Sequence, residues 1–303
     1  MQGDGGGGAI GGFTLFPGAK QRVLGQGGSN ACLLYTSFTV GLICLIPVLF
    51  VISASVTPYS ELLKNGGFVL IPRKFTNVAY VEMLADGALS HAMWVTVKLT
   101  VIATALNLVV TLMLAYPLSR HSMPLSGAMM KIVMFCMLFD AGIVPTYLIV
   151  RKTGLINTLW AMIVPTLVSA YNLVIMKAFF EGLPEELFEA ARIDGANEFR
   201  ILWHLILPMA LPIILTIGMY YAVDHWNCYL LSIYYITKDQ LKPLQVILRR
   251  LLDASRNAAD QELVPTETLK MAAVCYATAP IIVVYPFIQK YFVKGTLAGA
   301  VKG

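Results

Sequence analysis

Six apolar stretches, each long enough to cross a lipid bilayer, limit most strongly how this chain can fold. A membrane-spanning helix needs about 20 apolar residues, and such runs lie at 33–56, 92–118, 132–150, 159–180, 205–223 and 271–292. Only 13% of the residues are charged, whereas a soluble domain carries roughly 25%. The sequence therefore predicts an all-α integral membrane protein with six transmembrane helices.

The amino-terminal region has two interpretations. Residues 1–30 are rich in glycine and predict a disordered leader ahead of a membrane domain over 31–303. The first apolar stretch could instead be a cleaved signal peptide, with the small residues at 53–55 as its cut site. Its apolar run is longer than the roughly 7–15 residues of a signal sequence, so we interpret it as a retained helix.

A seventh apolar run, 226–236, is too short to span a bilayer alone. It either extends the fifth helix or returns into the membrane as a re-entrant segment. Irregular backbone is tolerated at membrane depth only where it is buried or lines water. This run is therefore a candidate lining for a transport path.

An acidic, Ala-rich insert, 184–204, separates the fourth and fifth apolar stretches. Pro184 suits the first turn of a helix, and two Glu residues come directly after it, where the helix dipole favours anions. Asp194 and Gly195 should end this helix, because Gly can adopt an unusual φ and Asp offers an oxygen to cap the next helix. Residues 197–204 then predict a second short helix, so the insert is expected to form two short helices between two spans.

The insert resembles the EAA loop of ABC-importer permeases, whose pattern is Glu-Ala-Ala, then Gly, then an apolar-x-Leu-Pro close. The matching positions are Glu189, Ala190, Ala191, Gly195, Leu205, Leu207 and Pro208. Landmarks of the carbohydrate-uptake branch occur in order, namely Ala-Tyr-Pro-Leu-Ser-Arg at 115–120, Pro145, Gly-Leu-Ile-Asn-Thr at 154–158, Pro165 and Trp226-Asn227. The resemblance covers about residues 90–294. More narrowly, the chain is similar to the permeases that take up oligosaccharides derived from polymers, including those of the alginate importer.

This resemblance implies a permease subunit of an ATP-driven, binding-protein-dependent importer in the bacterial inner membrane. Such a subunit works with a second permease, expected to form a heterodimer, a pair of cytoplasmic ATPase subunits and a periplasmic or extracellular solute-binding protein. The insert would dock into the ATPase, with Glu189 offering charge-assisted bonds and Phe188 or Leu187 an apolar anchor. The predicted coupling residues are Leu187, Phe188, Glu189, Ala190, Ala191, Asp194 and Gly195.

Charge alone does not orient the chain in the membrane. With the amino terminus inside, ten Lys and Arg residues fall in the cytoplasm and eleven outside, so the positive-inside rule does not decide. The resemblance puts the insert in the cytoplasm, and with six spans both termini are then cytoplasmic.

No phosphate-binding Gly-x-x-x-x-Gly-Lys loop, nucleophile motif or His/Cys zinc cluster occurs in the sequence. The chain is therefore not predicted to be an enzyme or to hold a cofactor or metal, and ATP and Mg²⁺ would be used by the partner ATPase. No basic run interleaved with aromatic residues indicates nucleic-acid binding.

An ion-coupled secondary transporter working without an ATPase is the alternative, and a membrane enzyme is a third hypothesis. Secondary transporters usually show internal repeats and intramembrane charges. Asp140 and Asp224 lie in or beside spans, where carboxylates are functional candidates. Against this alternative, the pattern of residues 132–150 does not recur elsewhere in the chain, and such a transporter does not need a cytoplasmic helical insert.

The region after Tyr220 is rich in aromatic rings with polar tips, which can stack on sugars and bond their hydroxyls. An aromatic belt at the membrane interface is the competing interpretation. The predicted substrate-path residues are Asp140, Tyr220, Asp224, Trp226, Asn227 and Tyr229.

The polar segment 238–270 should face outside, where it is either a solvated surface or the contact for the solute-binding protein, with Arg249 and Arg250 as contact residues. The cargo implied by the family branch is an oligosaccharide. Basic residues on the outer side weakly favour an acidic, alginate-like one, because positive potential concentrates anions.

Overall fold

The computed structural model describes residues 26–85, 87–120, 122–257 and 266–300, and every regular element in these ranges is a helix. The first 25 residues of the predicted leader, and 258–265 of the predicted outer segment, lie outside them. Contacts divide the chain into two units, 1–50 and 51–303. The first unit holds most of α1 (Gln26–Ser55), whose side chains from 34 to 49 are all exposed and mostly apolar, as suits a helix in lipid.

Three helices are long and apolar enough to span a membrane without interruption: α1, α4 (Ala88–Leu118) and α15 (Thr266–Ala300). Three bent pairs bring the number of candidate spans in the described chain to six. They are α5 (Ser126–Leu138) with α6 (Ile143–Lys152), α7 (Trp160–Ile163) with α8 (Ala170–Glu181), and α10 (Glu198–Ile201) through α11 (Leu207–Met209) with α12 (Leu211–Trp226). The all-α, six-span prediction is confirmed, although the third, fourth and fifth spans are not continuous helices.

Local sequence explains the three bends. The third span turns by 115° beside Gly142, which has a φ of 81° that side chains disfavour. The fourth bends by 50° after the short helix η1 (Val164–Thr166), which contains Pro165. The fifth bends by 80° at Ala210, two residues before Pro212, whose ring removes a backbone donor.

The remaining helices connect or flank these spans. They are α2 (Tyr59–Lys64), α3 (Val78–Ala85), α9 (Glu185–Ile193), the π-helical turn η2 (Leu202–Ile206), α13 (Leu230–Tyr235), η3 (Asp239–Leu241) and α14 (Leu244–Asn257). The seventh apolar run therefore ends α12 and then forms a separate short helix rather than extending the fifth span.

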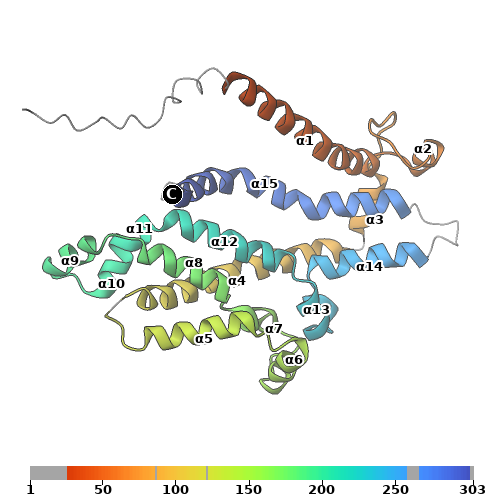
Figure 1. Ribbon diagram of the computed structural model, residues 1–303. Coiled ribbons are helices and arrows are strands. Elements are labelled where there is room, and N and C mark those ends of the chain that lie inside the picture. The colour runs from red at the N-terminus through yellow and green to blue at the C-terminus, as the bar shows by residue number, and fades with distance from the viewer. Residues whose placement is uncertain (1–25, 86, 121, 258–265, 301–303) are drawn as a thin grey trace, which may run out of the picture. The chain divides into compact units, whose positions relative to one another are not determined.

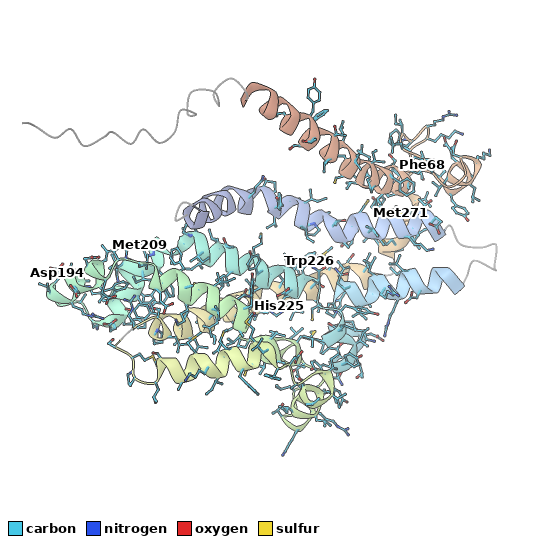
Figure 2. The ribbon with its side chains drawn as sticks, viewed as in Figure 1. Phe68, Asp194, Met209, His225, Trp226 and Met271 are labelled. Atoms are coloured by element: carbon cyan, nitrogen blue, oxygen red, sulfur yellow. The ribbon has the colours of Figure 1, made fainter. Side chains whose placement is uncertain are left out.

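In the second unit, α4, α8 and α12 pack side by side and share one apolar cluster with the insert. Helices α9 and α10 lie at one end of this bundle, while α6 and α13 lie at the other (Figure 1). Asp194 marks the tip of the insert end, and His225 and Trp226 lie far from it, toward the middle of the bundle (Figure 2). The fold thus separates an exposed insert from a polar region deep among the spans.

Candidate functional site

The turn inside the insert depends on Gly195. Its φ is 77°, its N–H donates to the Arg192 carbonyl at 3.0 Å, and the Ala196 N–H donates to the Ala191 carbonyl at 3.0 Å. This left-handed ending is costly for any residue with a Cβ. The predicted unusual φ at Gly195 is confirmed.

The cap of the second insert helix comes from a residue other than the one predicted. Asp194 is the C-terminal cap residue of α9, and the Asn197 side chain caps α10 by accepting a 2.8 Å bond from the Arg200 N–H. The prediction that Asp194 supplies this oxygen is wrong. The turn occupies Gly195 and Ala196, so α10 begins only after Asn197. Its first free N–H groups therefore lie within reach of the Asn197 side chain rather than that of Asp194.

The two faces of α9 differ sharply. Phe188 is fully buried in this chain's own core, so the expectation that it anchors to a partner does not fit its position. Leu187 is half-buried, and Glu189 and Ala190 are exposed. Ile193 is 87% exposed, which sequence reasoning missed. The signal was its spacing, because five residues from Phe188 correspond to about 140° around a helix.

A polar joint connects the insert to α4, and it consists of Tyr116, Arg120, Glu185, Arg192 and Glu198. Glu198 is its centre. The Tyr116 hydroxyl donates to Glu198 Oε2 at 2.6 Å, while Arg192 Nε and Nη2 lie 3.0 Å and 2.9 Å from Glu198 Oε1. One carboxylate thus holds α4, α9 and α10 together.

Arg120 completes the joint from just beyond the end of α4. Its side chain is 7% exposed, and its Nη1 lies 3.7 Å from Glu185 Oε2. Its Cζ lies 3.3 Å from the centre of the Phe188 ring, a cation–π contact that offsets part of the cost of burying the charge. The pKa of the Arg120 guanidinium is lowered, chiefly by burial, and the nearby Tyr116, Glu185 and Glu198 only partly offset this effect.

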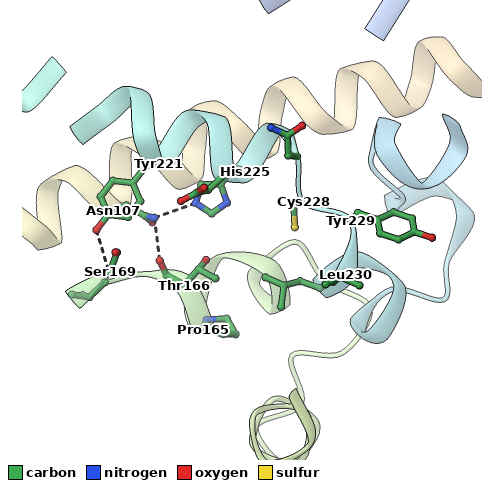
Figure 3. A pocket seen from close by; sticks show the side chains of 13 residues that line it. Asn107, Pro165, Thr166, Ser169, Tyr221, His225, Cys228, Tyr229 and Leu230 are labelled. Carbon is green, nitrogen blue, oxygen red and sulfur yellow. Dashed lines mark hydrogen bonds between the residues drawn. The ribbon is translucent and has the colours of Figure 1, made fainter. Parts of the chain in front are cut away.

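A cavity of about 490 Å³ opens deeper in the bundle (Figure 3). Of the six predicted substrate-path residues, Asp224, Asn227 and Tyr229 line it. The full lining is Asn107, Pro165, Thr166, Val168, Ser169, Tyr221, Asp224, His225, Asn227, Cys228, Tyr229, Leu230 and Leu231.

The other three predicted path residues lie outside the cavity lining. Trp226 is 9% exposed and packs in an apolar cluster with Leu244 and Ala272. Asp140 is exposed at the bend of the third span, where its carboxylate accepts a 3.0 Å bond from the Gly142 N–H. Tyr220 is half-buried on α12.

Hydrogen bonds between spans fix the polar wall of the cavity. Asn107 Nδ2 lies 3.1 Å from both the Thr166 carbonyl and His225 Nε2, so this ring nitrogen accepts. The Tyr221 hydroxyl lies 2.8 Å from Thr111 Oγ1 and accepts a 3.0 Å bond from the Ser169 N–H. Figure 3 shows Asn107, Tyr221 and His225 together.

Sequence reasoning missed Asn107 as a wall residue. The available signal was a buried amide inside a long apolar run, since polar groups at membrane depth face the protein interior. Asn107 Oδ1 has no hydrogen-bond partner within the described ranges. Because Asn107 is fully buried, this unpaired acceptor lies beneath the cavity surface.

Asn157 holds α13 against the loop after α6. Its φ is 62°, and its Oδ1 accepts bonds from Thr237 N at 2.7 Å, Thr237 Oγ1 at 2.8 Å and Lys238 N at 3.2 Å. Its own N–H donates to the Tyr235 carbonyl at 2.9 Å. This clamp fixes the segment that carries the cavity residues Leu230 and Leu231.

Arg249 and Arg250 lie on α14, and roughly half of each side chain is exposed. Arg249 Nε is 3.1 Å from Asp253 Oδ2, and Arg250 Nη1 is 2.9 Å from Asp239 Oδ1. Hydrogen bonds from Lys242 and Arg250 lower the pKa of the Asp239 carboxyl. Both arginines therefore belong to a mixed-charge surface.

No cluster of three or more His, Cys, Asp or Glu side chains suited to a metal occurs among the described residues.

A helical insert between bent spans, joined to a bundle with an open cavity lined in part by polar side chains, is the arrangement expected of a multi-span membrane transport subunit. The family model "Binding-protein-dependent transport system inner membrane component" matches residues 99–297, and the chain belongs to this family. It is thus an inner-membrane permease component of an ABC importer, a class that works with an ATPase and a solute-binding protein. Membership of a transport-permease family is consistent with the prediction that the chain is not an enzyme.

Individual relatives agree with this assignment. The "Polygalacturonan/rhamnogalacturonan transport system permease protein YtcP" of Bacillus subtilis (strain 168) is 40% identical over 269 residues, which is 86% of this chain and 94% of that protein. "Protein LplC" of the same organism is 39% identical over 270 residues, 87% of this chain and 91% of that protein.

A solved structure is also similar along nearly the whole chain. The crystal structure of "a bacterial ABC transporter involved in the import of the acidic polysaccharide alginate" matches with a TM-score of 0.78 and 29% identity, covering 92% of this chain and all of that one. The resemblance to carbohydrate-importer permeases stated from the sequence is confirmed.

Proposed function

We propose that this permease imports an oligosaccharide and that its insert converts closure of a partner ATPase into alternating access. The observation that carries the proposal is the division of α9 into two faces. Phe188 fastens one face to the bundle, while Glu189, Ala190 and Ile193 present the other to solvent. A surface that is both exposed and firmly attached can receive a partner's motion and pass it on.

In the docked complex, the ATPase contacts the exposed part of the insert. Leu187 and Ile193 supply apolar contacts, and Glu189 accepts charge-assisted bonds, which are stronger than neutral ones. Asp194, Gly195, Ala190 and Ala191 keep the turn narrow enough to enter a groove. The insert is then cytoplasmic, and with six spans both chain termini lie in the cytoplasm.

The partner subunits supply what this chain does not carry. ATP and Mg²⁺ bind to a pair of ATPase subunits, and this chain binds no cofactor of its own. A second, non-identical permease completes the translocation path, and the solute-binding protein delivers cargo on the outer side, near Arg249 and Arg250.

Co-purification with the ATPase and transport by the reconstituted complex test this proposal, using Gly195→Asp as the perturbation. A Cβ at φ 77° is strained whatever space surrounds it, so we expect weak assembly or hydrolysis without uptake. Gly127→Asp is the matched control, because Gly127 has an ordinary φ and open space around its Cβ position. Normal uptake by the Gly195 variant would refute docking through this turn.

For the cargo, we propose an acidic oligosaccharide that passes the cavity wall. Asp224, Asn227 and Tyr229 offer polar groups of the kind that bond sugar hydroxyls. Two similar proteins are named for polygalacturonan and for the acidic polysaccharide alginate, which are both built from uronic acids. Solute-stimulated ATP hydrolysis should respond to uronic oligosaccharides, and a response to neutral sugars alone would contradict the acidic cargo.

A further inference from the structure

Helix α4 runs without a break from the joint to the cavity. Tyr116, in its last turn, contacts the insert, and Thr111 and Asn107, further along the same helix, contact Tyr221 and His225 in the cavity wall. Asn107 and Tyr116 are nine positions apart, or about 13.5 Å along an α-helix. One rigid element therefore touches both the insert and the cavity wall.

The two spans that flank the insert in sequence connect the insert to the cavity less directly than α4 does. Helix α8 reaches α9 through the non-helical residues 182–184. Helix α12 reaches α10 through a π-helical turn and the 80° bend at Ala210. Bends of this kind absorb changes in backbone angle, whereas the 31-residue α4 is straight enough to count as one continuous span.

We propose that Tyr116 and Glu198 couple the insert to α4, and that α4 carries the movement of the insert to the cavity wall. This inference rests on the proposed function. Tyr116 and Glu198 are positioning residues, because neither lines the cavity near Asn107 or belongs to the exposed face of α9.

The geometry of the joint suits this role. Glu198 accepts a bond from the Tyr116 hydroxyl on one oxygen and bonds from two Arg192 nitrogens on the other. The Arg192 bonds join α9 to α10, and α10 cannot move away from α4 without breaking the charge-assisted bond to Tyr116. The Arg120–Phe188 stacking adds a second, independent contact between the end of α4 and α9.

The natural thiol Cys228 offers a direct reporter of movement at the cavity. It lines the cavity and is 7% exposed. The experiment uses the complete transporter with the other cysteines replaced by Ser, and measures the maleimide labelling rate of Cys228 with and without ATP and vanadate. The replaced cysteines are Cys32, Cys44, Cys136 and Cys275.

The variants are Tyr116→Phe, Glu198→Gln and the two together. In the unmodified complex, ATP should change the Cys228 labelling rate. We expect each single variant to reduce that change, and the sugar transported per ATP hydrolysed, several-fold. Because both changes break the same bond, the double variant should be no worse than the more affected single one.

Glu181→Gln is the matched control. It removes the Lys177–Glu181 ion pair, which lies near the insert but within the single helix α8. We expect it to leave both the labelling response and the coupling ratio as in the unmodified complex.

The outcomes separate this inference from the proposed function. If the unmodified complex does not bind the ATPase, or shows no ATP-dependent labelling change, the proposed function fails. If it responds and the joint variants respond equally well, transmission through α4 is overturned. Should Glu198→Gln not assemble, Tyr116→Phe decides, because it removes one hydroxyl and keeps the ring packed edge-on against Phe180.

Discussion

Replacing Asn157 by Ala should loosen the cavity wall without touching any residue in it. Asn157 combines a left-handed backbone with a carboxamide oxygen that accepts three hydrogen bonds from Thr237 and Lys238. Asn adopts this backbone more readily than Ala. The substitution therefore removes the bonds and adds strain at once.

The size of the effect can be worked out from these two contributions. A typical intramolecular hydrogen bond contributes about 0.5–1.5 kcal/mol, and the low end applies here because Thr237 and Lys238 are exposed. Left-handed backbone costs a non-Gly residue about 1–2 kcal/mol. Asn157 already bears part of that backbone cost, so the lost bonds and the added strain should together lower the free energy of unfolding by about 2–3 kcal/mol, a large share of a typical protein's stability.

Two further substitutions at Asn157 separate the contributions. Asn157→Gly relieves the strain of the left-handed backbone but removes the side-chain oxygen that accepts the three bonds. Asn157→Asp keeps an oxygen that can accept them. We expect thermal unfolding in detergent to rank the proteins unmodified, Asp, Gly and Ala, from most to least stable. Sugar uptake by the Ala variant should weaken as α13 becomes less ordered. If the Ala variant were as stable as the Asp variant, the clamp would not hold this segment.

The remaining predictions concern the insert, the cavity boundary and the outer surface. Phe188→Ala should lower the unfolding free energy by about 3–5 kcal/mol, because the ring is fully buried against Arg120. Leu187→Ala should instead weaken ATPase binding and leave the melting temperature unchanged. Trp226→Ala should lower the melting temperature of the subunit, and a selective loss of uptake with normal stability would return Trp226 to the substrate path. Charge reversal of Arg249 together with Arg250 should reduce stimulation by the solute-binding protein and hardly change stability, because exposed ion pairs contribute about 0.2–1 kcal/mol. Unchanged stimulation would relocate that contact to residues 59–86.

Local chemistry explains which parts of the insert were predictable. The φ of Gly195 is predictable from the sequence because only Gly occupies such a turn cheaply between two helices. The cap is not, because Asp194 and Asn197 are both good capping residues and the length of the turn between them decides. The inward direction of Phe188 depends on the neighbouring α4, which lies far away in sequence.

The bends in the spans illustrate a different limit. Pro165, Pro212 and Gly142 are visible in the sequence, but Pro and Gly are common in transmembrane helices, where neighbouring groups satisfy the freed backbone. Whether such a residue bends a span depends on what packs beside it. The apolar runs therefore predict the number of spans and not their continuity.

The cavity wall shows the same dependence on tertiary structure. Trp226 and Tyr229 look equivalent in sequence, as aromatic residues near the end of one span. The end of α12 directs Trp226 toward Leu244 and Ala272, and the non-helical residues after α12 bring Tyr229 to the cavity. Asn107 shows no such ambiguity, since an amide buried in an apolar helix must find partners among other spans. A polar residue inside a long apolar run is thus a better guide to the cavity wall than an aromatic residue at a span end, and here the same helix also holds the joint.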